Sequence, residues 1–190
     1  MITADLIKKI TEKNFNEIVS IRRHLHMNPE LSFQEFETSK YVASKLNEMG
    51  IAFQDNIAGT GLVGLIHGKN NNGRVVALRA DMDALPITEQ NQVSYKSQNT
   101  GVMHACGHDA HTASLLGAAS VLNELREHFD GTIKLLFQPG EEKLPGGASL
   151  MIEQGALQNP TPNSVIGQHV MPLIPAGKVR SEEHTSELQS

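Results

Sequence analysis

Four short apolar segments, each bounded by glycine, asparagine or proline, constrain the fold of this chain more than any other feature. They are GLVGLIHG (61–68), RVVALRA (74–80), GTIKLLFQP (131–139) and SVIGQHV (164–170). Apolar runs of this length, bounded by turn-forming residues, are typical of buried strands. The chain therefore contains at least the elements of a sheet.

Segments with helical periodicity alternate with these strands. Residues 4–28 and 34–49 repeat apolar positions at helical spacing, and residues 107–128 and 146–155 predict two further helices. The inward face of the second helix is expected to carry Phe36, Tyr41, Val42 and Leu46. Alternation of strands and helices predicts an α/β fold, with a mostly parallel mixed sheet flanked by helices.

The composition argues against several kinds of partner. The formal net charge is -5, so there is no basic footprint for nucleic acid. No apolar run approaches the length of a membrane span. The N-terminal segment is amphipathic and partly acidic, unlike a signal peptide, and the single cysteine, Cys106, has no partner for an internal disulfide. We therefore expect a cytoplasmic protein that binds neither nucleic acid nor membrane.

The last eleven residues, RSEEHTSELQS (180–190), do not continue the α/β pattern. They are polar, they begin no periodic element, and they match the peptide encoded by the start of a common short-read sequencing adapter. We interpret them as a sequence artefact rather than a natural charged tail. The natural part of the chain is then expected to be residues 1–179.

Polar side chains follow the predicted strands where each strand ends. Asp81 and Asp83 follow one strand, Glu141 and Glu142 follow another, and His169 stands near the end of the last. The carboxyl ends of parallel strands lie on one edge of a sheet, where ligands bind. These residues are therefore expected to converge, although they are distant in the sequence.

The segment HACGHDAH, from His104 to His111, combines three histidines, one cysteine and one aspartate at the start of a predicted helix. In an extended loop Cys106 and His108 can face one point, and thiolate and imidazole are good ligands for zinc-like ions. The positive helix N-terminus is expected to favour the thiolate. Taken singly, each residue has a plain structural alternative, but their clustering favours a metal site.

Glu141 and Glu142 lie in a loop bounded by glycine and proline, PGEEKLPGG (139–147). Adjacent side chains in a loop point apart, so one can bind metal while the other faces the substrate water. Metal-assisted hydrolysis needs this division, because the ion lowers the pKa of water and a free carboxylate takes its proton. An isolated pair of glutamates is most often a solvated turn. His169 alone would similarly be a strand-end histidine with a backbone partner.

Five blocks in a fixed order resemble the amidohydrolase branch of the M20 metallopeptidases. They are RRHLHMNPELSFQEFETS, ALRADMDALPI, MHACGHDAHTASLLGAA, FQPGEE with GGASLMIEQG, and GQHV, and the match runs from about residue 15 to residue 179. That branch includes hippurate hydrolases, plant auxin-conjugate hydrolases and bacterial N-acetyl amino acid deacetylases. The resemblance implies a zinc-peptidase-like α/β catalytic domain around two divalent ions, of which this chain would be the N-terminal part.

The resemblance also implies roles for individual residues. The implied metal ligands are Cys106, His108, Glu142 and His169, and the implied general base is Glu141. Asp81 falls where related enzymes place an aspartate that orients a ligand, but the histidine that accompanies it there is absent, and Arg79 precedes it. A fifth ligand, a histidine near the C-terminus of the full enzyme, has no counterpart here. Neither has the lid domain, through which the full enzyme would form a homodimer or a higher oligomer.

The implied function is metal-dependent hydrolysis of the amide bond of small N-acyl amino acids, which releases a carboxylate and the free amino acid. The ions would be Mn or Zn, with Co or Ni also acceptable to such ligands. The chain by itself is expected to be inactive. Two alternatives stay open: a metal-independent amidase with Cys106 as nucleophile and His104 or His108 as base, and a metal-binding fragment without turnover.

Overall fold

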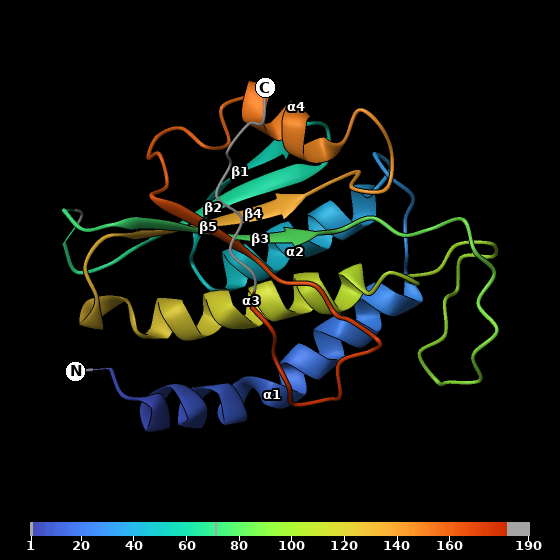
Figure 1. Ribbon diagram of the computed structural model, residues 1–190, viewed down its shortest axis with the longest axis horizontal. Coiled ribbons are helices and arrows are strands. Elements are labelled where there is room, and N and C mark those ends of the chain that lie inside the picture. The colour runs from blue at the N-terminus through green and yellow to red at the C-terminus, as the bar shows by residue number, and fades with distance from the viewer. Residues whose placement is uncertain (1, 71, 182–190) are drawn as a thin grey trace.

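A computed structural model of the chain describes residues 2–70 and 72–181. Within them, five strands form one sheet in the order β1-β2-β4-β3-β5 (Figure 1). The strands are β1 (Ala52–Ile57), β2 (Gly61–His67), β3 (Val75–Asp81), β4 (Thr132–Gln138) and β5 (Ser164–Gly167). β4 pairs with β3 and β3 with β5 in parallel, whereas β1–β2 and β2–β4 are antiparallel. The predicted α/β class with a mixed sheet is confirmed, and its parallel part is the half that carries the polar residues.

Helices cover both faces of the sheet. They are α1 (Ala4–Met27), α2 (Phe36–Glu48), α3 (His108–Glu124) and α4 (Gly147–Glu153), and a 3-10 turn (Arg126–His128) follows α3. In Figure 1, α1 and α3 lie below the sheet and α4 lies above it. α1 packs along α3 so closely that a Cβ atom at Gly117 would lie 2.7 Å from Cδ1 of Ile18. The glycine at position 117 of α3 therefore permits this close approach.

Two apolar cores lie on opposite faces of the sheet because successive strand residues point to opposite sides. On β4, Leu135 and Phe137 belong to the main core between the sheet and the helices α2 and α3, whereas Leu136 belongs to a second core with Met151 of α4. Leu135 and Phe137 are fully buried. This double burial explains why the strand is apolar along most of its length.

The predicted inward face of α2 is right for Val42 and Leu46 but wrong for Phe36, whose side chain is 58% exposed. The buried stripe of α2 runs through Thr38, Val42 and Leu46 at intervals of four residues. Phe36 lies two residues before Thr38, which is more than half a turn away around the helix. Its apolar character therefore did not indicate its direction.

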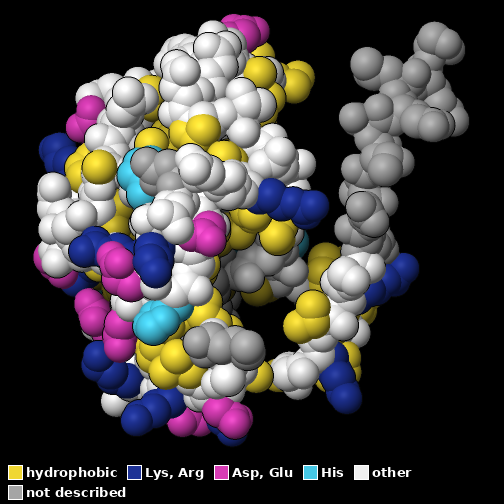
Figure 2. All heavy atoms as spheres, turned by 90° about the vertical axis from the view of Figure 1, so that its left-hand side faces the viewer, with side chains coloured by type: hydrophobic (Ala, Val, Ile, Leu, Met, Phe, Trp, Pro, Cys, Tyr) yellow, Lys and Arg dark blue, Asp and Glu magenta, His cyan; other side chains and the backbone are white. Residues whose placement is uncertain are grey.

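The described part of the chain contains no helix that is both long enough and apolar enough to cross a membrane. On the face shown in Figure 2, acidic and basic side chains are interspersed, without a patch of one sign. Of the adapter-like segment 180–190, only residues 180 and 181 are described, so the interpretation of that segment otherwise lies outside the described residues.

The fold brings the ends of β3 and β4 to the edge of the sheet where α3 begins (Figure 1). β5 ends at Gly167, three residues before the end predicted from the sequence, so His169 lies in the segment that follows the strand. The residues at this edge come from four separate segments, and their side chains form the cluster described next.

Candidate metal centre

His108, the first residue of α3, is the member shared by every group of possible metal ligands found among the described residues. Its Nδ1 lies 3.2 Å from Oδ1 of Asp83. In the neutral ring Nδ1 donates to that carboxylate, which leaves the lone pair of Nε2 free. This Nε2 is buried and has no hydrogen-bond partner in the described structure. A buried polar atom without a partner is costly, so its environment indicates a bound species.

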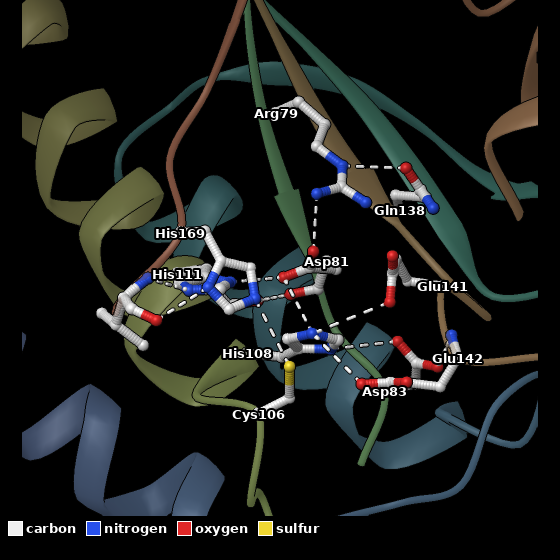
Figure 3. Close-up of polar contacts among 12 residues, drawn as sticks. Arg79, Asp81, Asp83, Cys106, His108, His111, Gln138, Glu141, Glu142 and His169 are labelled. Atoms are coloured by element: carbon white, nitrogen blue, oxygen red, sulfur yellow. Dashed lines mark hydrogen bonds and ion pairs between the residues drawn. The ribbon is translucent and has the colours of Figure 1, made fainter. Parts of the chain in front are cut away.

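The two glutamates of the PGEE loop lie beside this free nitrogen (Figure 3). Oε1 of Glu142 is 3.8 Å from Nε2 of His108, and Oε2 of Glu141 is 4.0 Å from it. The side chain of Glu141 is 42% exposed and that of Glu142 is 25% exposed. Both carboxylates therefore border the same point, and Glu141 is the more open to solvent.

Cys106 and His169 complete the cluster from the other side. Sγ of Cys106 lies 3.3 Å from Nε2 of His169, while Nδ1 of His169 donates to the carbonyl oxygen of Val170 at 2.7 Å. The potential ligand atoms of Cys106, His108 and His169 all lie within 4.8 Å of one another, as do those of His108, Glu141 and Glu142. The structure thus brings together all five residues that the sequence analysis put in the site.

Asp83 holds His108 in place and is itself held by several donors. Oγ of Ser32 lies 2.6 Å from Oδ2 of Asp83, and the backbone amide of Glu142 donates to the same oxygen at 3.0 Å. Burial alone would raise the pKa of this carboxyl, but the hydrogen bonds from His108, from Ser32 and from the backbone lower it to about 2. Asp83 is therefore ionised at neutral pH and fixes which nitrogen of His108 faces the cluster.

The electrostatic environment of the cluster favours positive charge. Burial alone would lower the pKa of His108, but Asp83, Asp81 and Glu142 raise it above its usual value. Burial raises the pKa of the Cys106 thiol to about 11, and the carboxylates of Glu142, Asp81 and Glu141 contribute in the same direction. Burial, followed by the nearby carboxylates, therefore opposes the thiolate form that the helix N-terminus was expected to favour. A cation placed here would reverse that balance.

Asp81 and His111 form a further part of the site that the sequence analysis left without a firm role. Oδ1 of Asp81 lies 2.6 Å from Nδ1 of His111 and 3.7 Å from Nε2 of His108, and the three side chains form the third possible ligand group. Burial alone would raise the pKa of Asp81, but His111 and then Arg79 lower it. The i,i+3 spacing puts His108 and His111 on one face of α3, and this was the signal that could have placed His111 in the site.

His104, expected from the sequence as a possible base for Cys106, makes no hydrogen bond to it. Its side chain is buried, and neither ring nitrogen has a hydrogen-bond partner among the described residues. Burial lowers its pKa to about 4. The imidazole in contact with Cys106 belongs instead to His169.

The donor set fits divalent metal ions. One thiol, two imidazoles and two carboxylates meet around the unpaired Nε2 of His108, and thiolate, imidazole and carboxylate are the usual zinc ligands. Fold and donor set together define an α/β protein with a candidate metal centre at the carboxyl edge of its sheet.

Comparison with known families agrees with this class. The family described as Peptidase family M20/M25/M40 matches residues 77–184, more than half of the chain. The chain therefore belongs to this family.

Named relatives are similar over nearly the whole chain. An N-acyl-L-amino acid amidohydrolase of Geobacillus stearothermophilus is 43% identical over 93% of this chain and 47% of its own length. The IAA-amino acid hydrolase ILR1-like 2 of Arabidopsis thaliana is 48% identical over 88% of this chain and 37% of its own length. A crystal structure from Bacillus subtilis, described as a dinuclear metal-binding peptidase of the M20 family, superposes with a TM-score of 0.79. It has 41% identity over 88% of this chain and 45% of that one. The chain thus spans less than half the length of the proteins it matches.

Proposed function

We propose that the complete protein carrying this chain hydrolyses the amide bond of small N-acyl amino acids, with two divalent ions bound by Cys106, His108, Glu142 and His169. The observation that carries the proposal is the buried, unpaired Nε2 of His108, which faces a thiol and two carboxylates. The names of the bacterial and plant relatives support the substrate class. The dinuclear site named for the Bacillus subtilis structure supports the number of ions.

The two glutamates divide the work. When bound, divalent ions would lower the pKa of a coordinated water molecule and polarise the amide carbonyl. Glu142, the less exposed carboxylate, serves as a ligand, and Asp83 fixes the His108 ring so that Nε2 serves as another. Glu141, the more exposed, accepts a proton from the attacking water and passes it to the amine nitrogen as the C–N bond breaks.

The proposal extends to the setting of the enzyme. Zn or Mn are the expected ions, and Co or Ni suit the same ligands. A thiolate ligand at the lone Cys106 must stay reduced, which favours the cytoplasm. Homo-oligomerisation through a lid domain, and a fifth ligand, would come from sequence outside this chain. We also propose that residues 1–179 are the natural part and are inactive by themselves.

The test compares Glu141→Gln with Glu142→Gln in the complete protein, assayed on a hippurate-like substrate with added Zn or Mn. Glu141→Gln is expected to keep both ions by elemental analysis and to bind substrate, but to lose about a hundredfold to ten-thousandfold in kcat. Glu142→Gln is expected to lose at least one ion, because it removes a ligand. Near-normal turnover by Glu141→Gln, or loss of metal from that variant instead, would show that the roles are misassigned.

A second candidate, a metal-independent cysteine amidase, is favoured by one observation: the 3.3 Å contact between Cys106 and His169 has the geometry of a nucleophile and its base. Against it stands the thiol pKa of about 11, which keeps Cys106 protonated at neutral pH. A chelator separates the two candidates, since it abolishes the activity of the metalloenzyme and spares the thiol enzyme. Assay of residues 1–179 beside the complete protein tests the third alternative, a metal-binding fragment without turnover.

A further inference from the structure

We propose that His111 is a positioning residue for His169: its imidazole accepts a hydrogen bond from the backbone amide of Val170 and so anchors the segment that carries His169 beside Cys106. The inference rests on the proposed metal function, because it assigns a purpose to the placement of one proposed ligand. We call residues 168–171 the His169 segment. His111 is not one of the proposed ligands, and its proposed action on His169 runs through this backbone contact.

The hydrogen bonds of His111 define a single orientation of the ring. Nδ1 lies 2.6 Å from Oδ1 of Asp81, and the amide nitrogen of Val170 lies 2.9 Å from Nε2. A backbone amide can only donate, so Nε2 must carry a lone pair, and the ring proton must therefore be on Nδ1, where Asp81 accepts it. Each partner thus requires the same tautomer, and a doubly protonated ring could not accept the Val170 bond.

Asp81 is in turn fixed by the sheet. Nη1 of Arg79 lies 2.6 Å from Oδ2 of Asp81, and Nε of the same guanidinium donates to Oε1 of Gln138 at 2.8 Å. A continuous series of hydrogen bonds therefore runs from β4 through β3 to α3 and ends at the backbone of the His169 segment (Figure 3). Arg79 stands where the histidine expected beside Asp81 is missing, and this series gives it a role.

The His169 segment has few other attachments. Past Gly167, the hydrogen bonds that join it to other described elements are the Val170–His111 bond and the Cys106–His169 contact. Val170 remains 43% exposed, so burial alone does not fix it. A Cβ atom on Gly107 would lie 2.2 Å from Cγ2 of Val170, so glycine at 107 is what lets the segment approach the start of α3.

The anchor places His169 directly. Its ring centre lies 4.6 Å from that of His111, with the ring planes at 63°. Nδ1 of His169 donates to the carbonyl oxygen of Val170, so Nε2 is the nitrogen turned toward Cys106. Val170, whose amide is held by His111, is thus adjacent to His169. A shift of the segment would therefore move Nε2 of His169 away from the cluster.

The test removes the backbone N–H of Val170, which donates to His111. Val170→Pro in the complete protein is compared with Val170→Ala, which keeps the amide, and with His169→Ala, which removes the proposed ligand. Ion affinity is measured by chelator competition, and the ligand field is followed in the Co-substituted protein, where absorption from the Cys106–Co bond reports that this ligand stays. Val170→Pro is expected to lower the affinity for one of the two ions about tenfold to a hundredfold. Its cobalt spectrum is expected to resemble that of His169→Ala. Val170→Ala is expected to match the wild type.

A double-mutant cycle distinguishes positioning from general disruption. His111→Leu removes the acceptor, and the double variant with Val170→Pro is expected to bind ions no more weakly than either single variant, because both remove the same bond. Should Val170→Pro fail to fold, an ester in place of the 169–170 amide bond removes the same donor. Equal ion affinity and cobalt spectra for the variant without the donor and for Val170→Ala, or fully additive losses in the cycle, would overturn the inference. A wild type that binds no ions would instead refute the proposed function itself.

Discussion

Single buried carboxylates that are not proposed as ligands decide where the proposed ligands point. Asp83 accepts hydrogen bonds from Nδ1 of His108 and from the backbone amide of Glu142. Glu35, fully buried, accepts from the backbone amide of Gly140 at 2.8 Å and from Oγ1 of Thr60 at 2.6 Å. Each carboxylate therefore connects a distant segment to the loop that carries Glu141 and Glu142. These hydrogen bonds to buried carboxylates hold the candidate centre in place as much as the proposed ligands do.

Asp83→Asn tests this dependence at one residue. The amide can still accept from His108 through its oxygen, but its NH₂ group then faces the backbone amide of Glu142, which can only donate and is left without an acceptor. We expect ion affinity to fall about tenfold to a hundredfold, measured by chelator competition. Asp55→Asn, at an exposed position on β1, serves as the matched control and should leave affinity unchanged. Wild-type affinity in Asp83→Asn would contradict the role given to Asp83.

Residue types indicated the candidate ligands from the sequence alone, but not their partners. The clustering of Cys106 and His108 before a helix, and of Glu141 and Glu142 after a strand, were visible signals of metal chemistry. The pairing of His111 with Val170 was not, because it joins a side chain to a backbone amide 59 residues away. Nothing in the identity of residue 170 marks it as a donor, since every residue except proline offers the same N–H.

At the scale of elements, the strands predicted from the sequence are those with apolar runs, and they include β5, all of whose residues are exposed. β2, β3 and β4 are apolar along most of their length, so the sequence revealed them. β1, with the sequence AFQDNI, is largely exposed at the edge of the sheet, and its polar residues gave no period-two signal. The order of strands could not be predicted either, because β4 inserts between β2 and β3 although it follows them by more than fifty residues.

The start of α4 offers a sharp test of how elements position the site. A Cβ atom on Gly147 would lie 1.7 Å from the carbonyl oxygen of Pro139, and the Gly147 amide donates to Gly140 at 2.9 Å. Gly147→Ala must therefore separate α4 from the loop that carries Glu141 and Glu142.

We expect Gly147→Ala to destabilise the protein by about 1–3 kcal/mol, measured by urea unfolding, and to weaken ion binding. The control is Ala148→Ser at the next, exposed position, which should change neither quantity. If the two variants unfold at the same urea concentration, the close approach of α4 to the loop is not required.

At the scale of the whole molecule, a second polar network separate from the candidate centre joins α1, α3 and the long segment between β3 and α3. Nδ1 of His26 lies 2.8 Å from Oδ2 of Asp109, and Nε2 lies 3.1 Å from Oε1 of Glu89. Nε of Arg22 lies 2.8 Å from the same oxygen of Asp109. Glu89 also accepts from the amide of Ser97 at 2.6 Å. Removal of one partner from such a buried network leaves an uncompensated charge, so the network connects three parts of the fold.

This network predicts how stability depends on pH. The hydrogen bond to Asp109, followed by that to Glu89, raises the pKa of His26 above its usual 6.5 against the opposing effect of burial. A group whose pKa is higher in the folded state stabilises that state fully below its unfolded pKa, and the contribution is lost as pH rises through the folded value. The stabilisation from charged His26 should therefore be complete below pH 6.5 and should decline above it.

His26→Gln provides the measurement, because glutamine can donate to one carboxylate but cannot become charged. In metal-free protein, the free energy of unfolding of the wild type should exceed that of the variant by about 3 kcal/mol near pH 6 and by less near pH 9. Urea unfolding at several pH values gives both curves. Lys8→Gln, at an exposed position on α1, is the control and should follow the wild-type pH profile. Parallel profiles for the wild type and His26→Gln would show that the pKa of His26 is the same in the folded and unfolded states. The network would then act without a charged histidine.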